Sequence, residues 1–313
     1  MKLVTFTFNG VQKVGALVDQ QVIDLNAGAA ALLDEQGEAN PYALAQAIVP
    51  AEMNNFLAQG EQALSKAQEV IQYVNGGQTE GPHGEKLRYA LADVKLNSPL
   101  PRPGKVVCVG LNYIDHVRES NMEVPKSPVI FSKYNNAVIG PDDTILLPNN
   151  SEEVDYEAEL AFVVGKKAKK ISEEEAMDYV AGYTIVNDVS ARDIQLGDGQ
   201  WVRGKSPDTF APMGPVLVTK DEIEDPHQLD IKLRLNGETM QDSNTENLIF
   251  KIPYILSYLS QSMTFEPGDV IATGTPPGVG MARDPKVYLK DGDEVVVEVE
   301  KIGELRNTVK ADR

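Results

Sequence analysis

The seven residues Ser98-Pro-Leu-Pro-Arg-Pro-Gly104 separate two parts of the chain that differ in texture. Three prolines and a glycine in so short a run form a stiff, extended connector. Before it, residues 27–76 are rich in Ala, Leu, Gln and Glu, with apolar residues at helical spacing. After it, short apolar runs alternate with Gly and Pro turns. We therefore place a domain boundary at residues 98–104.

The part before the connector, residues 1–97, is predicted to be a small α+β domain. Two alternating runs flank Asn9-Gly10, which is the strongest short signal for a β-hairpin. Residues 14–25 continue the strand pattern. Pro41 and Pro50 then divide the helical stretch into several short helices.

The part after the connector, residues 105–313, is predicted to be a β-rich domain. Strands are expected at residues 106–109, 128–131, 159–164, 183–187, 216–218, 229–236, 270–273 and 294–299. Helices are expected only at residues 172–180, where Ser172 and Glu175 form a capping box, and at residues 252–261. Many strands with few helices favour an α+β, β-rich fold with an antiparallel or mixed roll.

The charge of the chain limits its partners. Its 313 residues carry a formal net charge of −18, so it repels nucleic acids and anionic membranes. No apolar run approaches the roughly 20 residues of a membrane span, and the N-terminus lacks a signal-peptide pattern. The single cysteine, Cys108, excludes an intrachain disulfide and is expected to be a small buried residue. We expect a cytoplasmic protein, and an anionic substrate would need a local patch of cations such as Lys133, Arg192 and Arg203.

One segment matches the sequence pattern of a nucleotide-binding motif but lacks the structural context that the motif requires. Gly199-Gln-Trp-Val-Arg-Gly-Lys-Ser206 matches the P-loop pattern in full. That motif needs a buried strand before it and a helix after it, so that backbone amides hold the phosphates. Leu196-Gly-Asp198 precedes it and Pro207 follows it at once. We reject the P-loop, although Lys205 itself can still offer a point charge to a developing oxyanion.

Three carboxylates suggest a metal site. In the run Asp155-Tyr-Glu-Ala-Glu-Leu160, Glu157 and Glu159 are two residues apart and project from the same face of a strand. Adjacent carboxylates repel unless a cation lies between them or one is protonated. Asp188 ends another apolar run and could complete the site. A solvated strand face and a turn-forming aspartate remain the alternatives.

One of the three histidines has a carboxylate at helical spacing. If the segment around it is helical, His116 and Glu119 share a face at positions i and i+3. A carboxylate fixes the imidazole tautomer and raises its basicity, as in a general base that activates water. An ordinary surface ion pair is the alternative. His83 and His227 lie in polar sequence and are expected at the surface.

Taken together, these segments resemble the fumarylacetoacetate hydrolase family. The matching pieces occur in the family's order and cover essentially all of residues 100–313. They are Gly-Leu-Asn-Tyr-Ile-Asp-His at 110–116, Asp-Tyr-Glu-Ala-Glu-Leu at 155–160, Asn-Asp-Val-Ser-Ala-Arg-Asp-Ile-Gln at 187–195, Gly-Lys-Ser at 204–206, and Gly-Asp-Val-Ile-Ala-Thr-Gly-Thr-Pro-Pro-Gly-Val-Gly at 268–280.

The resemblance implies a β-roll catalytic domain that usually forms a homodimer. It implies Mg²⁺ or Mn²⁺ held by Glu157, Glu159 and Asp188. It further implies the following roles: His116 and Glu119 as a water-activating pair on a mobile lid, Lys205 and Gln195 as contacts of the oxygen that becomes negative, Thr275 as the holder of the substrate carboxylate, and Arg192 as support.

Several reactions are compatible with such a site. A small anionic 2-keto acid would bind the ion, which would stabilise an enolate. We expect a hydrolase that cleaves the C–C bond of an acylpyruvate or fumarylpyruvate. Decarboxylation of oxaloacetate and isomerisation of 2-hydroxy-diene-dioates remain alternatives on the same site, and a non-catalytic ligand-binding domain is a remote one.

Overall fold

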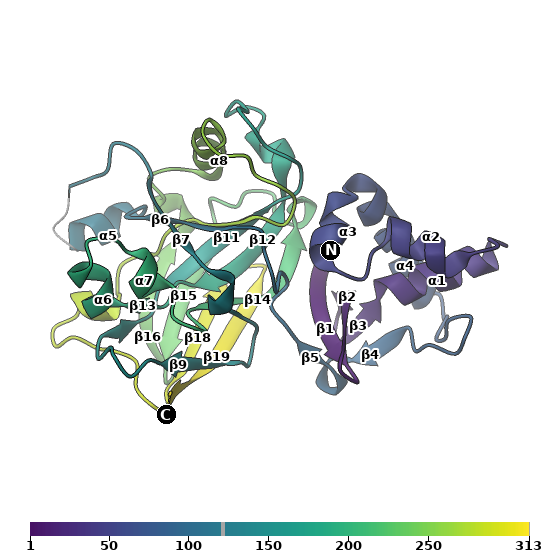
Figure 1. The fold of residues 1–313 in the computed structure, drawn as a ribbon, viewed down its shortest axis with the longest axis horizontal. Coiled ribbons are helices and arrows are strands. Elements are labelled where there is room, and N and C mark those ends of the chain that lie inside the picture. The colour runs from purple at the N-terminus through teal and green to yellow at the C-terminus, as the bar shows by residue number, and fades with distance from the viewer. Residues whose placement is uncertain (120–122, 313) are drawn as a thin grey trace.

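A computed structural model describes residues 1–119 and 123–312 of the chain. It contains a helical lobe at the N-terminal end and a larger, strand-rich body (Figure 1). The strand-rich mixed fold that the sequence predicts is confirmed. The segment 110–120, which carries the pair expected to lie on a lid, ends at Ser120, which lies outside the described residues.

The first 97 residues fold as a hairpin, four helices and short return strands. At the hairpin turn, Asn9 and Gly10 have φ angles of +49° and +77°, as the predicted tight turn requires. Asp24 caps the first helix by accepting a hydrogen bond from the Ala27 N–H at 3.0 Å. The elements are β1 (Lys2–Phe8), β2 (Val11–Val18), β3 (Gln21–Asp24), α1 (Leu25–Glu35), α2 (Pro41–Ile48), α3 (Met53–Ala58), α4 (Glu61–Asn75), β4 (Arg88–Ala90), η1 (Leu91–Asp93) and β5 (Lys95–Leu96).

The rest of the chain supplies most strands and four further α-helices. Its elements are β6 (Val106–Gly110), α5 (Ile114–Glu119), β7 (Val129–Lys133), η2 (Asn135–Ala137), β8 (Val138–Ile139), β9 (Thr144–Leu147), β10 (Val154–Asp155), β11 (Ala158–Val164), η3 (Ala176–Tyr179), β12 (Val180–Asn187), β13 (Ser190–Ala191), α6 (Arg192–Gly197), α7 (Val202–Lys205), β14 (Ala211–Thr219), η4 (Lys220–Glu222), β15 (Asp230–Leu235), β16 (Glu238–Asn244), η5 (Thr245–Asn247), α8 (Ile252–Ser260), β17 (Val270–Ala272), η6 (Gly280–Ala282), β18 (Glu294–Val299) and β19 (Gly303–Ala311).

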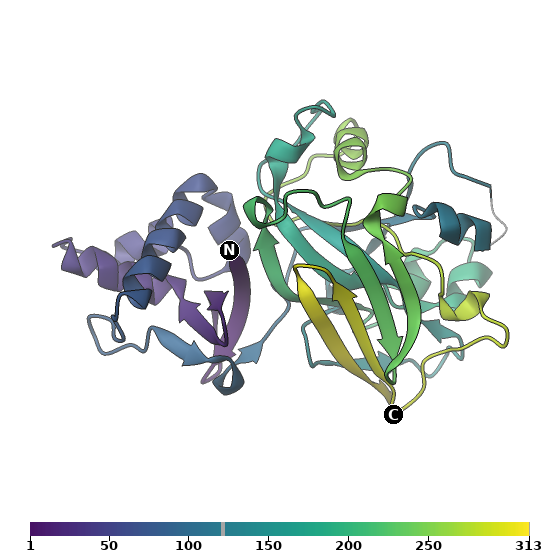
Figure 2. The same cartoon turned by 180° about the vertical axis from the view of Figure 1, so that it is seen from behind.

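Among the described residues, two large sheets and a small one of β10 and β13 are formed. Of the two large sheets, the larger has the order β4-β3-β2-β1-β14-β12-β11-β17-β6-β7, and the smaller has the order β16-β15-β18-β19-β9. Most neighbours are antiparallel, but β6 runs parallel to β17 and β9 runs parallel to β19, so the sheets are mixed. Figure 2 shows the smaller sheet packed across the body.

Strand β11 is buried on both faces, which explains its unbroken apolar run. Leu160, Phe162 and Val164 belong to the core between the two sheets. Ala161 and Val163 face a second core that includes the apolar sides of α1–α4. Burying each large apolar side chain contributes about 1.5–3 kcal/mol, so this strand is a rigid base for groups at its ends.

The predicted boundary at residues 98–104 stays a prediction. The connector is packed against the protein: Leu100 is buried, and the Thr5 hydroxyl of β1 donates a hydrogen bond to the Pro99 carbonyl at 2.7 Å. Moreover, β1 pairs with β14, so one sheet runs through both parts of the chain.

The predicted helix at residues 172–180 is wrong in extent. Glu175 accepts from the Ser172 N–H at 3.1 Å, as in a capping box, but only the short helix η3 follows. The segment has room for about two turns before β12 begins, and so short a helix is not self-sustaining. The sequence also missed β9, β16 and β19. Among the described residues, every helix falls short of the length and apolar content that a membrane crossing requires.

Candidate active site

A cavity of about 430 Å³ opens among the short helices α5, α6 and α7. These helices lie at the end of the body away from α1–α4 (Figures 1 and 2). The cavity combines charged groups with an apolar wall. Its lining residues are Val109, Gly110, Leu111, His116, Glu119, Phe131, Glu157, Glu159, Arg192, Gln195, Leu196, Trp201, Lys205, Thr275, Met281 and Ala282.

The structure brings the three predicted carboxylates together. Glu159 lies in β11 and Glu157 lies just before it, so both project from the same face. Asp188 follows β12, the antiparallel neighbour of β11, and its N–H donates to the Glu157 carbonyl at 2.9 Å. One oxygen from each carboxylate lies within 4.8 Å of the other two, and all three side chains are buried.

Three buried cations lie against two of these carboxylates. Lys205 Nζ is 2.8 Å from Glu157 Oε2 and 3.0 Å from Asp188 Oδ2. Lys133 Nζ is 2.7 Å from Asp188 Oδ1, and Arg192 Nη2 is 2.6 Å from Glu157 Oε1. Burial opposes ionisation of Glu157, but the charges of Lys205 and Arg192 outweigh it and lower the Glu157 pKa.

Glu159 is different, because no cation contacts it among the described residues. Its Oε2 accepts a hydrogen bond from the Gly274 N–H at 2.8 Å. Burial and repulsion by Asp188 and Glu157 raise the pKa of Glu159 well above its usual value. A divalent cation between the three carboxylates would remove this repulsion. An all-oxygen donor set suits Mg²⁺ or Mn²⁺, so the residues fit the ion that the sequence predicts.

His116 and Glu119 lie one helical turn apart on α5, as their spacing predicts. His116 Nδ1 is 3.5 Å from Glu119 Oε2, which is a loose pairing. The Gly278 N–H donates to the same carboxylate at 3.1 Å. Partial burial disfavours the Glu119 anion, but its pairing with His116 and the hydrogen bond from Gly278 prevail and lower its pKa. Glu119 therefore lies between the imidazole and the loop after β17 and is hydrogen-bonded to the loop.

The predicted substrate-contacting residues also line this cavity. Gln195 Oε1 accepts from Arg192 Nη1 at 3.0 Å, which leaves the Gln195 amide N–H groups as possible donors. Thr275 Oγ1 accepts from Gln241 Nε2 at 2.9 Å, so its own hydrogen can be directed to a ligand. Arg192 donates to Asp155 through both Nε and Nη2 at 2.9 Å, which supports its predicted supporting role.

Some predicted groups lie elsewhere. Lys133 does not face the cavity, because Asp188 and the carbonyls of Val189 and Phe210 enclose it. Arg203 is exposed and pairs with Asp198. The expectation for His227 is wrong, because its side chain is only 18% exposed. His227 Nε2 accepts from the Ile252 N–H at 3.1 Å at the start of α8.

Cys108 is completely buried, as predicted, and burial together with nearby Asp188 and Glu159 raises its thiol pKa. His83 is exposed, also as predicted, and its ring is stacked on Tyr42.

The P-loop-like segment has a different use. Helix α6, and not a strand, precedes it, and α7 ends at Lys205 with Pro207 close behind. Gly204 allows α7 to touch α6, because a Cβ at this position would lie 2.6 Å from the Gln195 nitrogen. The glycine and lysine of the motif therefore place the Lys205 ammonium against the carboxylates.

Sequence reasoning missed several residues in or behind the cavity wall. Asp155 accepts from the Gly280 N–H at 2.7 Å and so ties the loop after β17 to Arg192. Phe131 and Trp201 form an apolar wall, with ring centroids 5.4 Å apart. An acidic residue beside the Glu157 pair was a visible signal for Asp155. The aromatic wall left no local signal, because its members are 70 positions apart.

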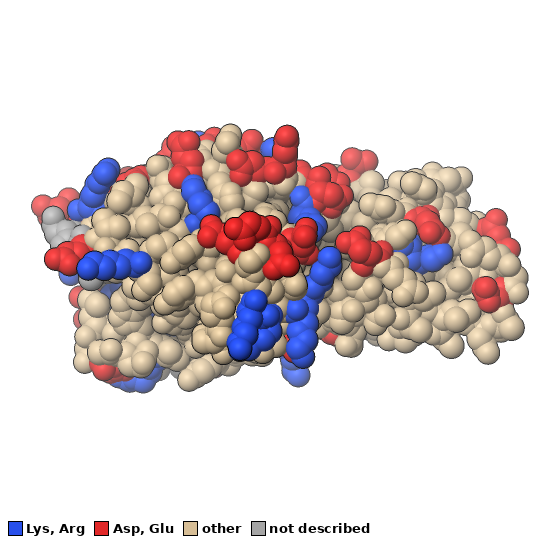
Figure 3. Space-filling model, turned by 90° about the horizontal axis from the view of Figure 1, so that it is seen from above, with Lys and Arg blue, Asp and Glu red and all other residues tan. Residues whose placement is uncertain are grey.

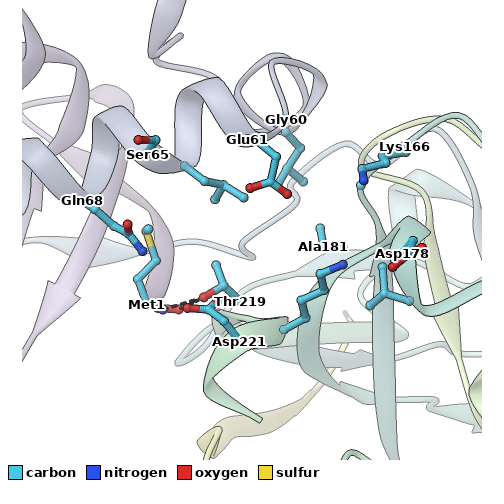
Figure 4. A pocket seen from close by; sticks show the side chains of 15 residues that line it. Met1, Gly60, Glu61, Ser65, Gln68, Lys166, Asp178, Ala181, Thr219 and Asp221 are labelled. Atoms are coloured by element: carbon cyan, nitrogen blue, oxygen red, sulfur yellow. Dashed lines mark hydrogen bonds between the residues drawn. The ribbon is translucent and has the colours of Figure 1, made fainter. Parts of the chain in front are cut away.

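A second cavity of about 440 Å³ has a different character. It lies between α4 and the edges of β12 and β14, and Figure 4 shows Glu61, Ser65 and Gln68 on one side of it. Lys166, Asp178 and Asp221 are on the other side. Its charged groups are mixed in sign and come from exposed positions, and it lacks the buried carboxylate cluster of the first cavity. Figure 3 likewise shows acidic and basic side chains interspersed over one face of the molecule.

Comparison with known proteins agrees with this geometry. The family described as fumarylacetoacetate (FAA) hydrolase C-terminal matches residues 105–310. The mitochondrial oxaloacetate tautomerase Fahd2a of Rattus norvegicus is 48% identical over 262 residues, which are 83% of this chain and 80% of the relative.

Solved structures are similar over the whole chain. The 5-carboxymethyl-2-hydroxymuconate delta-isomerase of Mycobacterium smegmatis is 32% identical with a TM-score of 0.73, and all of both chains is covered. Maleylpyruvate hydrolase of Sphingobium sp. SYK-6, in complex with manganese(II) and pyruvate, is 29% identical with a TM-score of 0.77, again over all of both chains.

Proposed function

The chain belongs to the fumarylacetoacetate hydrolase family of enzymes, and on that premise we propose that it interconverts the keto and enol forms of a small 2-keto acid of the oxaloacetate type with a divalent metal ion. One observation carries the proposal. Two carboxylates of the buried triad, Glu157 and Glu159, line the same cavity as the His116–Glu119 pair, and Asp188 completes the triad beside them. The rat relative, named as an oxaloacetate tautomerase, supports the choice of reaction.

Glu157, Glu159 and Asp188 would hold the ion, and Mg²⁺ and Mn²⁺ suit them equally. When bound, the ion would supply a Lewis acid that draws electrons toward the keto oxygen and makes the adjacent C–H more acidic. Lys205 adds a buried positive charge beside Glu157. These charges would let an acidic protein attract an anion.

The chain's own residues would move the proton. In the keto-to-enol direction, His116 removes a proton from carbon 3, and the C–H electron pair forms the C2–C3 double bond. The keto oxygen receives the carbonyl π electrons and takes up a proton from solvent. Glu119, 3.5 Å from the imidazole, would orient it. Thr275 and Gln195 would hold the carboxylate and the oxygen that becomes negative. The reverse reaction uses the same groups, and atoms balance because the two forms are isomers.

Hydrolysis of an acylpyruvate is the second candidate, and it is the reaction that the sequence favours. The His116–Glu119 pair supports it, since such a pair can activate water. Water would add to the distal carbonyl, the C3–C4 bond would break, and its electron pair would remain with the pyruvate enol. Decarboxylation of oxaloacetate and isomerisation of hydroxy-diene-dioates would pass through a similar enol and remain alternatives.

Parallel assays with Mn²⁺ would test this ranking. The enol form of oxaloacetate, acetylpyruvate and keto-oxaloacetate would be followed by absorbance and by CO₂ release. We expect fast, EDTA-sensitive ketonisation of the enol form, and its loss in Glu157→Ala. His116→Ala should reduce turnover by about 10²–10⁴-fold. Arg203→Gln, an exposed residue outside the cavity, is the matched control.

The outcomes separate the candidates. Preferred loss of acetylpyruvate would make hydrolysis the main activity, and stoichiometric CO₂ release would make it decarboxylation. Turnover that survives both EDTA and Glu157→Ala would refute the metal site.

Assembly and location stay predictions. We propose a homodimer, which sedimentation of the purified protein would test. We also propose that the protein is located in the cytoplasm. The rat relative is named as mitochondrial, so cell fractionation that compares the two compartments would test this.

A further inference from the structure

The chain between β6 and α5 makes a sterically disfavoured turn at the cavity. Leu111 has a φ angle of +55°, although it is not a glycine, and its side chain lines the cavity. Helix α5, which carries His116 and Glu119, begins only three residues later. Whatever holds this turn therefore sets the position of both side chains.

Asn112, the next residue, is completely buried, and both ends of its side-chain amide are hydrogen-bonded. Its Nδ2 donates to the carbonyls of Thr273 at 2.7 Å and Phe250 at 3.0 Å. Its Oδ1 accepts from the Phe250 N–H at 2.8 Å, and its main-chain carbonyl accepts from the Ile249 N–H at 2.7 Å. Asn112 thus joins the turn before α5, the end of β17 and the segment before α8.

The two sides of the cavity do not depend equally on this residue. Thr273 is also fixed by Leu160, whose carbonyl accepts from the Thr273 N–H at 3.0 Å and from its hydroxyl at 2.8 Å. Gly274, and with it the hydrogen bond to Glu159, should therefore remain in place without Asn112. Among the described residues, what supports the turn at Leu111 besides the Asn112 side chain is main-chain pairing alone: the Ile249 N–H bond to the Asn112 carbonyl and the bridge of Tyr113 with Leu248.

We propose that Asn112 is a positioning residue, which maintains the turn at Leu111 and so holds His116 over the cavity without touching substrate or metal. The turnover part of its test rests on the proposed function. A misplacement of about 1 Å at a catalytic group reduces rates by about 100-fold, which is the effect expected here.

The test compares Asn112→Ala and Asn112→Ser with the wild type. Asn135→Ala is the matched control, because the side chain of this exposed asparagine makes, among the described residues, a single hydrogen bond, to the Pro103 carbonyl. Trp201 is the only tryptophan of the chain and lines the cavity, so its fluorescence reports binding of Mn²⁺ and of oxalate. Hydrogen exchange followed by mass spectrometry reports the local order of residues 113–119.

We expect kcat to fall about 100-fold in both variants, while the Kd values for Mn²⁺ and for oxalate stay within threefold. Amides of residues 113–119 should exchange at least tenfold faster, and those of β11 should not change. If the wild type turned over no keto acid, the proposed function would fail, but binding and exchange would still decide the role of Asn112.

Three results would overturn the proposal. The first is a parallel loss of turnover and of Mn²⁺ binding with faster exchange throughout, which indicates a general structural role. The second is unchanged kcat and unchanged exchange. The third is failure of both variants to fold at 10 °C, because the residue would then serve overall stability.

Discussion

Removing the charge of Asp188 should destabilise the metal-free protein far more than removing the charge of Glu159. Asp188 Oδ1 contacts Lys133 at 2.7 Å and its Oδ2 contacts Lys205 at 3.0 Å, with all three side chains at most 2% exposed. Breaking a buried ion pair by removing one partner typically costs about 3–5 kcal/mol. We expect about 3 kcal/mol for Asp188→Asn, because Lys205 retains Glu157 and Lys133 retains carbonyl acceptors.

Glu159→Gln is the matched comparison, because it removes one buried charge of the same cluster. Gln retains an oxygen for the Gly274 N–H, and the repulsion that raises the Glu159 pKa disappears. The free energy of unfolding should therefore change by less than about 1 kcal/mol, in the stabilising direction, since this carboxylate has no cation to leave unpaired.

Urea unfolding in EDTA measures the difference. With an m-value of about 3 kcal/mol/M, Asp188→Asn should lower the midpoint by about 1 M, and Glu159→Gln should leave it unchanged or slightly higher. Equal losses in the two variants, or a larger loss in Glu159→Gln, would show that the pairing of Asp188 with two buried lysines does not govern stability.

Three further predictions concern metal, pH and packing. Mn²⁺ at 100 times its Kd should raise the free energy of unfolding by about 2.7 kcal/mol in the wild type and not in Glu157→Ala, and equal shifts in thermal melts would contradict the metal site. Burial and nearby Lys251 lower the pKa of His227 in the folded protein below its ordinary 6.5. As the pH falls, the imidazole is therefore protonated in the unfolded chain before it is protonated in the folded protein, and the free energy of unfolding decreases below about pH 6.5. His227→Gln keeps an acceptor for the start of α8 but cannot titrate, so its stability relative to the wild type should rise between pH 7 and pH 5, and a constant difference would refute this. Gly204→Ala should destabilise by about 1–3 kcal/mol and reduce turnover by moving Lys205, and unchanged urea midpoint and kcat would contradict the packing argument.

Local spacing was enough for the features that depend on a few neighbouring residues. The alternation of β-strands placed Glu157 and Glu159 on one face, and the helical repeat placed His116 next to Glu119. Asn9-Gly10 marked its hairpin for the same reason. The capping box at Ser172 and Glu175 led to a wrong prediction of a helix over residues 172–180, because a local signal does not determine how far a helix continues.

By itself, the sequence determined the class of fold, the oxygen-rich character of the site and the histidine–carboxylate pair, because strand and helix periodicities act within a few residues. Only the tertiary structure decided which cation pairs with which carboxylate. Lys205 contacts Glu157, which is 48 positions away in the sequence, whereas Lys133 pairs with Asp188 and does not face an anionic substrate in the cavity. It also decided that Asn112 joins segments more than 130 residues apart. Such contacts follow from the packing of distant strands, and in a buried site each cation pairs with the carboxylate that this packing brings within reach.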